Sequence, residues 1–179
     1  MKTIEPIIYS TVQQKVLKFL LKNPGEQFFS SQLTRLAGLT RSATNLALHD
    51  LVETGLVEYE TKGRMKFYSV SLDSPLVKET KYLLNLVFLN GIVNKLKPLC
   101  SKIILFGSAA RGENKKDSDF DLLLITNDKS KVNAILSKCE IREELQPVIV
   151  TQNEYAVMKA RNEVFYKEIQ MGRVLWERK

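Results

Sequence analysis

The sequence predicts a protein of the α+β class, with two small domains joined by a long helix. In the first part of the chain, apolar residues recur at helical spacing and glycines interrupt the pattern. Pro75 and Pro98 bracket a segment with one apolar helical stripe. After Pro98, short apolar runs typical of strands alternate with helical patterns. A length of 179 residues with 44% hydrophobic content is enough for a core in each domain. We expect an N-terminal domain over residues 1–72, a linker helix over 73–98 and a C-terminal mixed α/β domain over 99–179.

Three helices are predicted in the N-terminal domain. Apolar residues at helical spacing predict the first over residues 11–21. The second is expected over 30–37, capped by one of the two serines at its start and stopped by Gly38. Thr40 can cap the third, which runs over 40–54. The second and third helices are therefore joined by a tight turn.

A β-hairpin follows the three helices. Residues 56–61 and 64–71 alternate apolar and polar side chains around Lys62-Gly63. Two strands joined at this turn would present a basic tip.

Three helices followed by such a hairpin resemble the winged helix-turn-helix domains of microbial transcription regulators, over residues 1–72. The resemblance implies binding to double-stranded DNA, with the third helix in the major groove and the hairpin, or wing, beside it. Nine Lys and Arg against six acidic residues in this part, and a net charge of +7, agree with a polyanionic partner. The side chains expected to contact DNA are Arg41, Ser42, Thr44, Asn45, Lys62, Arg64 and Lys66. The alternative is a winged helix that makes protein contacts, its wing charges merely solvated.

The predicted linker helix has a continuous apolar stripe. The stripe could pack on the C-terminal domain or pair with a second copy of the chain. Winged-helix regulators read two-fold operators as dimers, and a helix this apolar needs a partner, so a homodimer is expected.

The C-terminal domain opens with a turn suited to phosphate. Residues 102–106 form an apolar run typical of a buried strand, and Gly107-Ser108 ends it where a short helix from Ala109 begins. A glycine lets a phosphate approach the backbone, the serine adds a hydroxyl, and the N–H groups of a helix start favour an anion.

Two carboxylates follow on the next predicted strand, over residues 120–125. Asp119 and Asp121 are two positions apart, so they project from the same face of a strand. Side by side they would repel each other unless a hard cation lay between them, and Mg²⁺ held by carboxylates and substrate phosphates meets that need. The combination predicts metal-assisted nucleotide chemistry.

The pattern Gly107-Ser108-x-x-Arg111-Gly112, five residues, then Ser118-Asp119-x-Asp121-Leu122 resembles the signature of the DNA polymerase β-like nucleotidyltransferases in their minimal form. The resemblance implies a mixed α/β domain of about eighty residues and transfer of a nucleotidyl group from a nucleoside triphosphate with Mg²⁺. It implies that Asp119 and Asp121 are the catalytic metal ligands. It also implies that the nucleotide is bound by Gly107, Ser108, Arg111 and Ser118.

The sequence departs from this family at a third carboxylate, which the family carries on a later strand. On the corresponding strand, residues 145–151, Gln146 and Pro147 stand where the aspartate is expected. The nearest acidic residues, Glu143 and Glu144, precede the strand. In a two-metal site, one ion grips the phosphates and the other activates the attacking hydroxyl. Loss of the third carboxylate would therefore weaken catalysis more than nucleotide binding. Pro147 is expected on an edge strand or at a bulge, because proline cannot donate to a sheet ladder.

The remaining elements alternate as a mixed α/β domain requires. Helices are expected over 129–139, 152–159 and 163–171, and an edge strand over 173–176.

Two functions remain open at this point. The chain is either an Mg²⁺-dependent nucleotidyltransferase with a DNA-binding domain, or a DNA-binding regulator whose second domain binds nucleotide or a partner without turnover. The sequence begins without a secretory signal, its longest apolar stretch is too short for a bilayer, and its two cysteines suit ordinary thiols. A cytoplasmic protein without membrane contact is expected.

Overall fold

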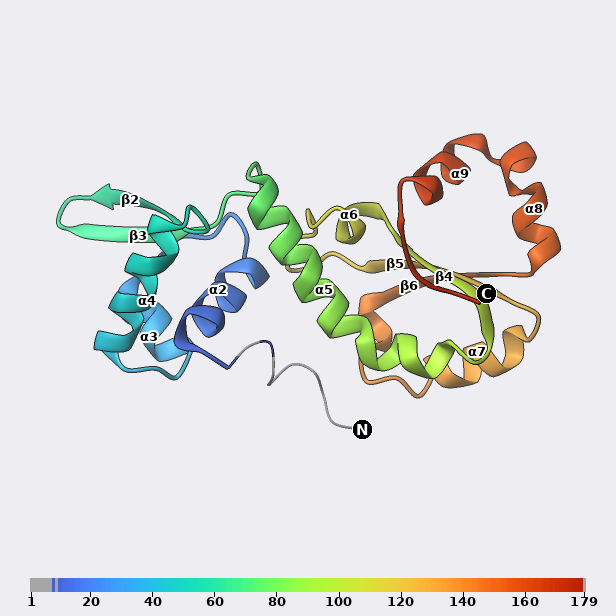
Figure 1. Cartoon of the computed structure of the whole chain (residues 1–179), viewed down its shortest axis with the longest axis horizontal. Helices are drawn as coiled ribbons and strands as arrows, with labels where there is room; N and C mark the ends of the chain where they lie inside the picture. The colour runs from blue at the N-terminus through green and yellow to red at the C-terminus, as the bar shows by residue number, and fades with distance from the viewer. Residues whose placement is uncertain (1–7, 9, 179) are drawn as a thin grey trace. The chain divides into compact units, whose positions relative to one another are not determined.

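The computed structural model describes residues 8 and 10–178, which form two compact units (Figure 1). The first unit ends at Val87 and the second begins at Phe88. Each has its own buried apolar core, as expected for a small domain.

Among the described residues before 73, the first unit contains three helices and a three-stranded antiparallel sheet (Figure 1). The sheet order is β1-β3-β2, and the core is made mostly of Leu and Val side chains. The elements before residue 73 are α2 (Val12–Lys22), β1 (Phe28–Phe29), α3 (Ser30–Leu36), α4 (Arg41–Glu53), β2 (Glu58–Lys62) and β3 (Met65–Ser69).

Side-chain caps fix where these helices begin. The Thr11 hydroxyl accepts from the Gln14 N–H, and the Gln14 side chain accepts from the Thr11 N–H, so α2 starts in a reciprocal capping box. Thr40 caps α4 as predicted. The predicted serine cap of α3 is wrong, because α3 begins one residue earlier and Phe29 precedes it. There the Gln32 side chain accepts from the Phe29 N–H at 3.0 Å.

The hairpin forms with a slightly shifted turn. Lys62 pairs with Met65, so the two turn residues are Gly63 and Arg64, and Gly63 has a φ of +62°. The short strand β1 was not predicted, since two residues give no periodicity, and it forms only because it pairs with β3.

The predicted linker helix is α5 (Pro75–Leu96), and each unit contains part of it. Val77 and Leu84 join the core of the first unit. Leu89 and Leu96, later in the helix, are fully buried. Within the residues that the structure describes, neither this helix nor any other is both long enough and apolar enough to cross a membrane.

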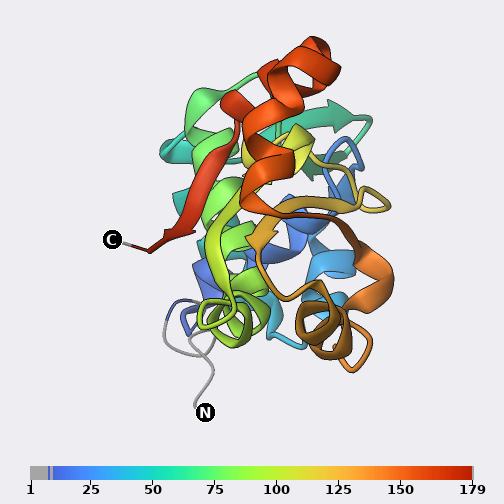
Figure 2. The same cartoon turned by 90° about the vertical axis from the view of Figure 1, so that its right-hand side faces the viewer.

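The second unit is a four-stranded mixed sheet with helices on both sides (Figure 2). The sheet order is β6-β5-β4-β7, with β5 and β6 parallel and the other neighbours antiparallel. After α5 come β4 (Cys100–Phe106), α6 (Gly107–Ala110), β5 (Phe120–Thr126), α7 (Lys129–Leu136), a 3₁₀ turn (Arg142–Glu144), β6 (Leu145–Val150), α8 (Gln152–Arg161), α9 (Glu163–Gln170) and β7 (Arg173–Glu177).

Alternating side chains of the strands face two different layers. Ile104, Phe106, Leu123 and Ile125 form a core with residues of α8 and α9, and the figures show these two helices on one side of the sheet with α7 on the other (Figures 1 and 2). Asp121 has the same parity as Leu123, so its side chain belongs to the α8–α9 face.

Both edges of the sheet agree with the sequence. Strand β7 lies at one edge, as predicted for residues 173–176, and β6 lies at the other. Pro147 is therefore on an edge strand, where its missing N–H costs no interior ladder bond. The helix predicted over 129–139 is shorter than expected and ends at Leu136.

Candidate functional site

The turn at Gly107 and the paired aspartates come together at one end of the sheet. Strand β4 ends at Phe106, whose strand partner is Asp121 on β5. Gly107 directly follows Phe106, so the turn lies beside the first residues of β5. The two halves of the sequence pattern therefore form one site, although ten residues separate Ser108 from Asp119.

Gly107 gives the Asp121 carboxylate its room. Its φ is +67°, a conformation that other residues rarely adopt. A Cβ at this position would collide with Oδ2 of Asp121 and would lie 3.2 Å from its Cγ. The glycine is therefore required twice, by the backbone turn and by the carboxylate that points towards it.

Asp119 and Asp121 differ in their surroundings. Asp119 is exposed, and its Oδ2 accepts a hydrogen bond from Nε2 of Gln146 at 3.2 Å. Asp121 is half-buried, and burial raises the pKa of its carboxyl above the usual value, with the negative charges of Glu168 and then Asp119 adding to the effect. All three of these effects disfavour the charged form of the Asp121 carboxylate.

The position of the expected third carboxylate is occupied by an amide. Gln146 is the strand partner of Asp121, and its side chain donates to Asp119. Glu143 and Glu144 lie exposed in the 3₁₀ turn. Among residues 8 and 10–178, no three acidic, His or Cys side chains are grouped closely enough to hold a metal ion.

One acidic residue near the site was not anticipated. Glu168, on α9, acts electrostatically on Asp121 although it is 47 positions away in sequence. The spacing of apolar residues in α9 could place Glu168 on the side of the helix that faces the sheet. The sequence does not indicate which strand α9 covers.

The loop between the turn and the aspartates is held by its own polar groups. Arg111 donates from Nε to Glu113 at 2.8 Å, and its side chain remains 45% exposed. The Ser118 hydroxyl accepts from the Lys115 N–H at 2.9 Å. Ser108 is half-buried at the start of the loop, where its carbonyl accepts from the Glu113 N–H. These contacts fix the conformation of the loop between Gly107 and Asp119.

The residues present fit a divalent cation with a nucleotide. Asp119 and Asp121 supply hard oxygen ligands, and the missing Cβ at Gly107 lets the Asp121 carboxylate lie against the turn. Mg²⁺ takes few protein ligands and completes its shell with water and phosphate oxygens. Asp119 and Asp121 would hold it, and Gly107 and Ser108 border the same space.

Four of the residues predicted to contact DNA lie on α4, and they differ in their exposure. Arg41, Ser42 and Asn45 are exposed at its N-terminal half. Asn45 also accepts a hydrogen bond from the Ser30 hydroxyl, which joins α4 to the start of α3.

Thr44 corrects the prediction. It is fully buried, and its hydroxyl donates to the Thr40 carbonyl at 2.9 Å, so it cannot contact a groove. Thr44, Ala47, Leu48 and Leu51 form the buried stripe of α4. That i, i+3, i+4, i+7 spacing was visible in the sequence and identifies Thr44 as a core position.

The hairpin carries the remaining predicted contacts. Arg64 and Lys66 are exposed, and the Lys66 ammonium lies 4.1 Å from the centroid of the Tyr59 ring. Lys62 donates to the Gln27 side chain at 2.7 Å and pairs with Glu60 at 3.1 Å. The charge of Lys62 is therefore partly compensated within the unit.

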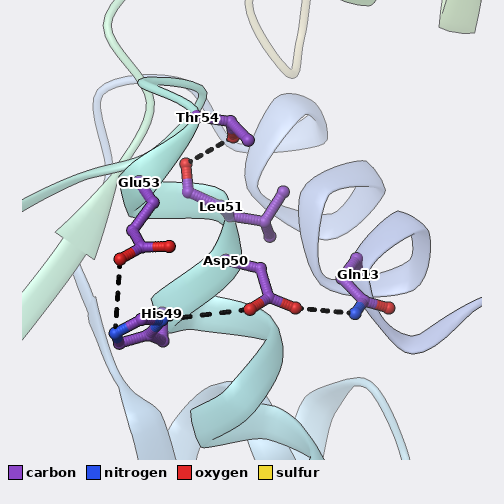
Figure 3. A network of polar contacts seen from close by, with 6 residues as sticks. All are labelled: Gln13, His49, Asp50, Leu51, Glu53 and Thr54. Carbon is purple, nitrogen blue, oxygen red and sulfur yellow. Dashed lines mark hydrogen bonds and ion pairs between the residues drawn. The ribbon is translucent and has the colours of Figure 1, made fainter.

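The C-terminal half of α4 is committed to polar contacts within the unit (Figure 3). His49 lies 3.7 Å from Glu53 and 3.9 Å from Asp50, and Asp50 accepts from the Gln13 amide of α2 at 2.9 Å. The polar side chains of this half of α4 are therefore engaged with one another and with α2.

Comparison with known proteins assigns the second unit. Residues 88–170 match the nucleotidyltransferase domain family. A protein of Methanocaldococcus jannaschii named "Putative protein adenylyltransferase" is 31% identical over 91 residues, which are 50% of this chain and 91% of that protein.

Two crystal structures from Sulfolobus solfataricus are similar at a lower level. A "putative nucleotidyltransferase" is 20% identical with a TM-score of 0.38, covering 56% of this chain and 87% of that one. The DNA-binding protein Sso10a-2 is 20% identical with a TM-score of 0.32, covering 46% of this chain and 92% of that one. TM-scores this low do not establish a shared fold, so the family assignment depends on the sequence matches.

Proposed function

Since the chain belongs to the nucleotidyltransferase domain family, we propose that it transfers a nucleotidyl group from a nucleoside triphosphate to a hydroxyl group, with Mg²⁺ held by Asp119 and Asp121. The observation that carries the proposal is the juxtaposition of the Gly107 turn and the Asp121 carboxylate, which brings a Cβ-free backbone turn and a candidate metal ligand together at one end of the sheet. Mg²⁺ would supply charge neutralisation at the transferred phosphoryl group.

The residues of the site have separate tasks in this reaction. Gly107 and Ser108 would border the phosphates, while Arg111, beyond its contact with Glu113, has exposed guanidinium surface for them. The acceptor oxygen forms a bond to the α-phosphorus, the bond from that phosphorus to the bridging oxygen breaks, and pyrophosphate leaves. The hydroxyl proton passes to water. Positioning and electrostatics account for most of the catalysis in such transfers.

Adenylyl transfer to a protein hydroxyl is the version of the reaction to test first. Its support is the name of the M. jannaschii relative, of which this chain covers 91%. A nucleic acid or a small molecule is the alternative acceptor.

The test compares the aspartates with a neighbouring acid. Asp119→Asn and Asp121→Asn should each abolish Mg²⁺-dependent ATP binding in calorimetry, because each removes a ligand charge from a site with few of them. Asp117→Asn, two positions earlier and exposed, is the matched control and should bind like the wild type. Incubation of each protein with labelled ATP, Mg²⁺ and cell extract then measures transfer. Unchanged binding in both site variants would exclude this site.

A second candidate function is a DNA-binding regulator whose nucleotidyltransferase domain binds nucleotide or a partner without turnover. Gln146 favours it, because an amide that donates to Asp119 replaces the carboxylate expected for the activating ion. In this case wild-type protein should bind Mg²⁺ and ATP yet transfer no label.

We also propose that the first unit is a winged helix-turn-helix that binds double-stranded DNA. Its support is the layout of α2, α3, α4 and the β2–β3 hairpin, with Arg41, Ser42 and Asn45 exposed on α4. On the hairpin, Arg64 and Lys66 are exposed.

The salt dependence of DNA affinity distinguishes residues that contact phosphates from residues that recognise bases. Arg64→Ala should reduce the slope of log affinity against log salt by about one unit, since one phosphate contact is lost. Arg41→Ala or Asn45→Ala should change the preferred sequence in a random-sequence selection. Lys15→Ala, an exposed lysine of α2, is the control for loss of one charge. No enriched sequence together with salt-independent affinity would mean that this unit does not read DNA.

A homodimer is the assembly that we propose for DNA binding, because two-fold operators require two copies. Sedimentation equilibrium at micromolar concentration measures it directly. Both ligands, DNA and nucleoside triphosphate, are available in the cytoplasm, which is where we expect the protein to act.

A further inference from the structure

We propose that Glu168 of α9 supplies the carboxylate that β6 lacks, and that it joins Asp121 as a ligand of a second divalent cation. The inference rests on the proposed function and names a third cation-binding residue of the same site. It places that residue on a helix instead of on the strand where the sequence led us to look for it.

The packing of α9 places Glu168 at the end of the sheet where Asp121 lies. Phe165, three residues before Glu168, has its ring 5.6 Å from the ring of Phe106 in an edge-to-face contact, and Phe106 is the strand partner of Asp121. Residues three apart share a helix face, so Glu168 follows Phe165 along the face that covers the end of β4.

The residues after Glu168 fix the end of the helix on the same strand. Ile169 is 1% exposed and packs in the core with Ile104 and Phe106. A Cβ on Gly172 would come within 2.7 Å of the Leu105 carbonyl oxygen, so the backbone there lies against β4. Residues on both sides of Glu168 therefore pack against β4, which fixes the position of its backbone.

The two carboxylates lack compensation. Asp121 and Glu168 are both half-buried, and within residues 8 and 10–178 neither side-chain carboxylate accepts a hydrogen bond or forms an ion pair. Half-buried like charges cost free energy unless a cation neutralises them.

The chemistry of β6 explains why the third carboxylate would come from elsewhere. Gln146 offers only an amide, which donates to one oxygen of Asp119. Asp121 lies on the face of the sheet that α9 covers, so an additional oxygen ligand could come from that helix. A small side-chain movement of Glu168 on cation binding would complete that ligand set, which is not assembled in the present structure.

The test counts cations in the full-length protein. Mn²⁺ binding is titrated calorimetrically, and by electron paramagnetic resonance of free Mn²⁺, in the presence of a non-hydrolysable ATP analogue. Wild type should bind two Mn²⁺, and Glu168→Gln should bind one, with the second at least tenfold weaker. Glu163→Gln is the matched control: it lies on the same helix, is exposed, and pairs only with Lys167 at 2.8 Å.

Two further measurements exclude a merely structural role. Without cation, Glu168→Gln should raise the unfolding temperature because it removes repulsion from Asp121, whereas loss of a structural contact would lower it. Adding Gln146→Asp to Glu168→Gln should restore the second Mn²⁺, because it returns a carboxylate to the strand.

The outcomes distinguish the two proposals. Nucleotide binding with the same Mn²⁺ count in wild type and Glu168→Gln overturns the role of Glu168 and leaves the proposed function standing. A wild-type protein that binds no nucleotide with any cation overturns the proposed function itself. A lower unfolding temperature in Glu168→Gln also counts against the inference.

Discussion

At the scale of single residues, the conformation of Gly107 and the position of the Asp121 side chain depend on each other. Gly107 adopts a φ of +67°, and the carboxylate of Asp121 occupies the volume that a side chain at Gly107 would take. The backbone conformation alone would favour glycine, but the close carboxylate makes it necessary. A substitution here therefore tests the site and the turn at once.

Gly107→Ala should lower the free energy of unfolding by more than the ~1–2 kcal/mol that a left-handed conformation costs an L-residue. Part of the loss comes from displacing Asp121, so ATP binding should also weaken. Gly63→Ala is the control: its φ of +62° carries the same conformational cost, and no atom lies within 4 Å of the added Cβ. Urea unfolding by circular dichroism and calorimetry of ATP measure both variants. Equal effects on stability and binding would show that Asp121 does not fill this space.

At the scale of elements, a buried lysine joins α5 to α2. Lys81 is 3% exposed, and its ammonium donates to the Leu21 carbonyl, near the end of α2, at 2.6 Å. Burial, helped by the charge of Lys22, lowers the pKa of Lys81 to about 8. The hydrogen bond satisfies a carbonyl that the helix end leaves without a partner, at the cost of burying a charge.

This lysine should make stability depend on pH. Between pH 8 and 10.5 the folded protein has lost the Lys81 proton while the unfolded chain still holds it, so the free energy of unfolding rises with pH over that window. Below about pH 8 the penalty of the buried charge is fully present. The free energy of unfolding of Lys81→Met, relative to wild type, should therefore fall as pH increases from 8 to 10.

Urea titrations at several pH values measure this difference. Lys15→Met replaces an exposed lysine of α2 and should follow the wild-type pH dependence. Parallel curves for wild type and Lys81→Met would contradict the prediction.

At the scale of the whole molecule, the two compact units carry different proposed ligands. The nucleotide site lies in the unit after residue 87, and so does Trp176, the single tryptophan of the chain. The Trp176 ring is half-buried on β7, with the Lys97 ammonium 5.5 Å from its centroid. Its fluorescence therefore reports the folding of the nucleotidyltransferase unit.

ATP with Mg²⁺ should stabilise the transition that Trp176 reports. At a ligand concentration of 100 times Kd, the free energy of unfolding should increase by about 2.7 kcal/mol, since only the folded unit binds. Arg64→Ala, in the other unit, should show the same increase, and Asp121→Asn should show none. An ATP effect that survives in Asp121→Asn would place nucleotide binding elsewhere.

The sequence by itself determined the features that contiguous residues encode. Helix periods, the Thr40 cap and the hairpin were predicted because each depends on a short segment. The Gly107 turn and the paired aspartates were recognisable for the same reason, as was the amide at Gln146 in place of a carboxylate. Pro147 was expected on an edge strand or at a bulge because proline has no N–H to donate, and it lies on the edge strand β6.

Only the tertiary structure decided which distant segments meet. Strand β1 exists because Phe28–Phe29 pairs with β3, and Thr44 is a core residue because its face of α4 packs inwards. Glu168 lies at the same end of the sheet as Asp121 because α9 packs across the end of β4. These contacts depend on the burial of apolar faces against one another, which local sequence patterns specify only as a need for a partner, without naming the partner.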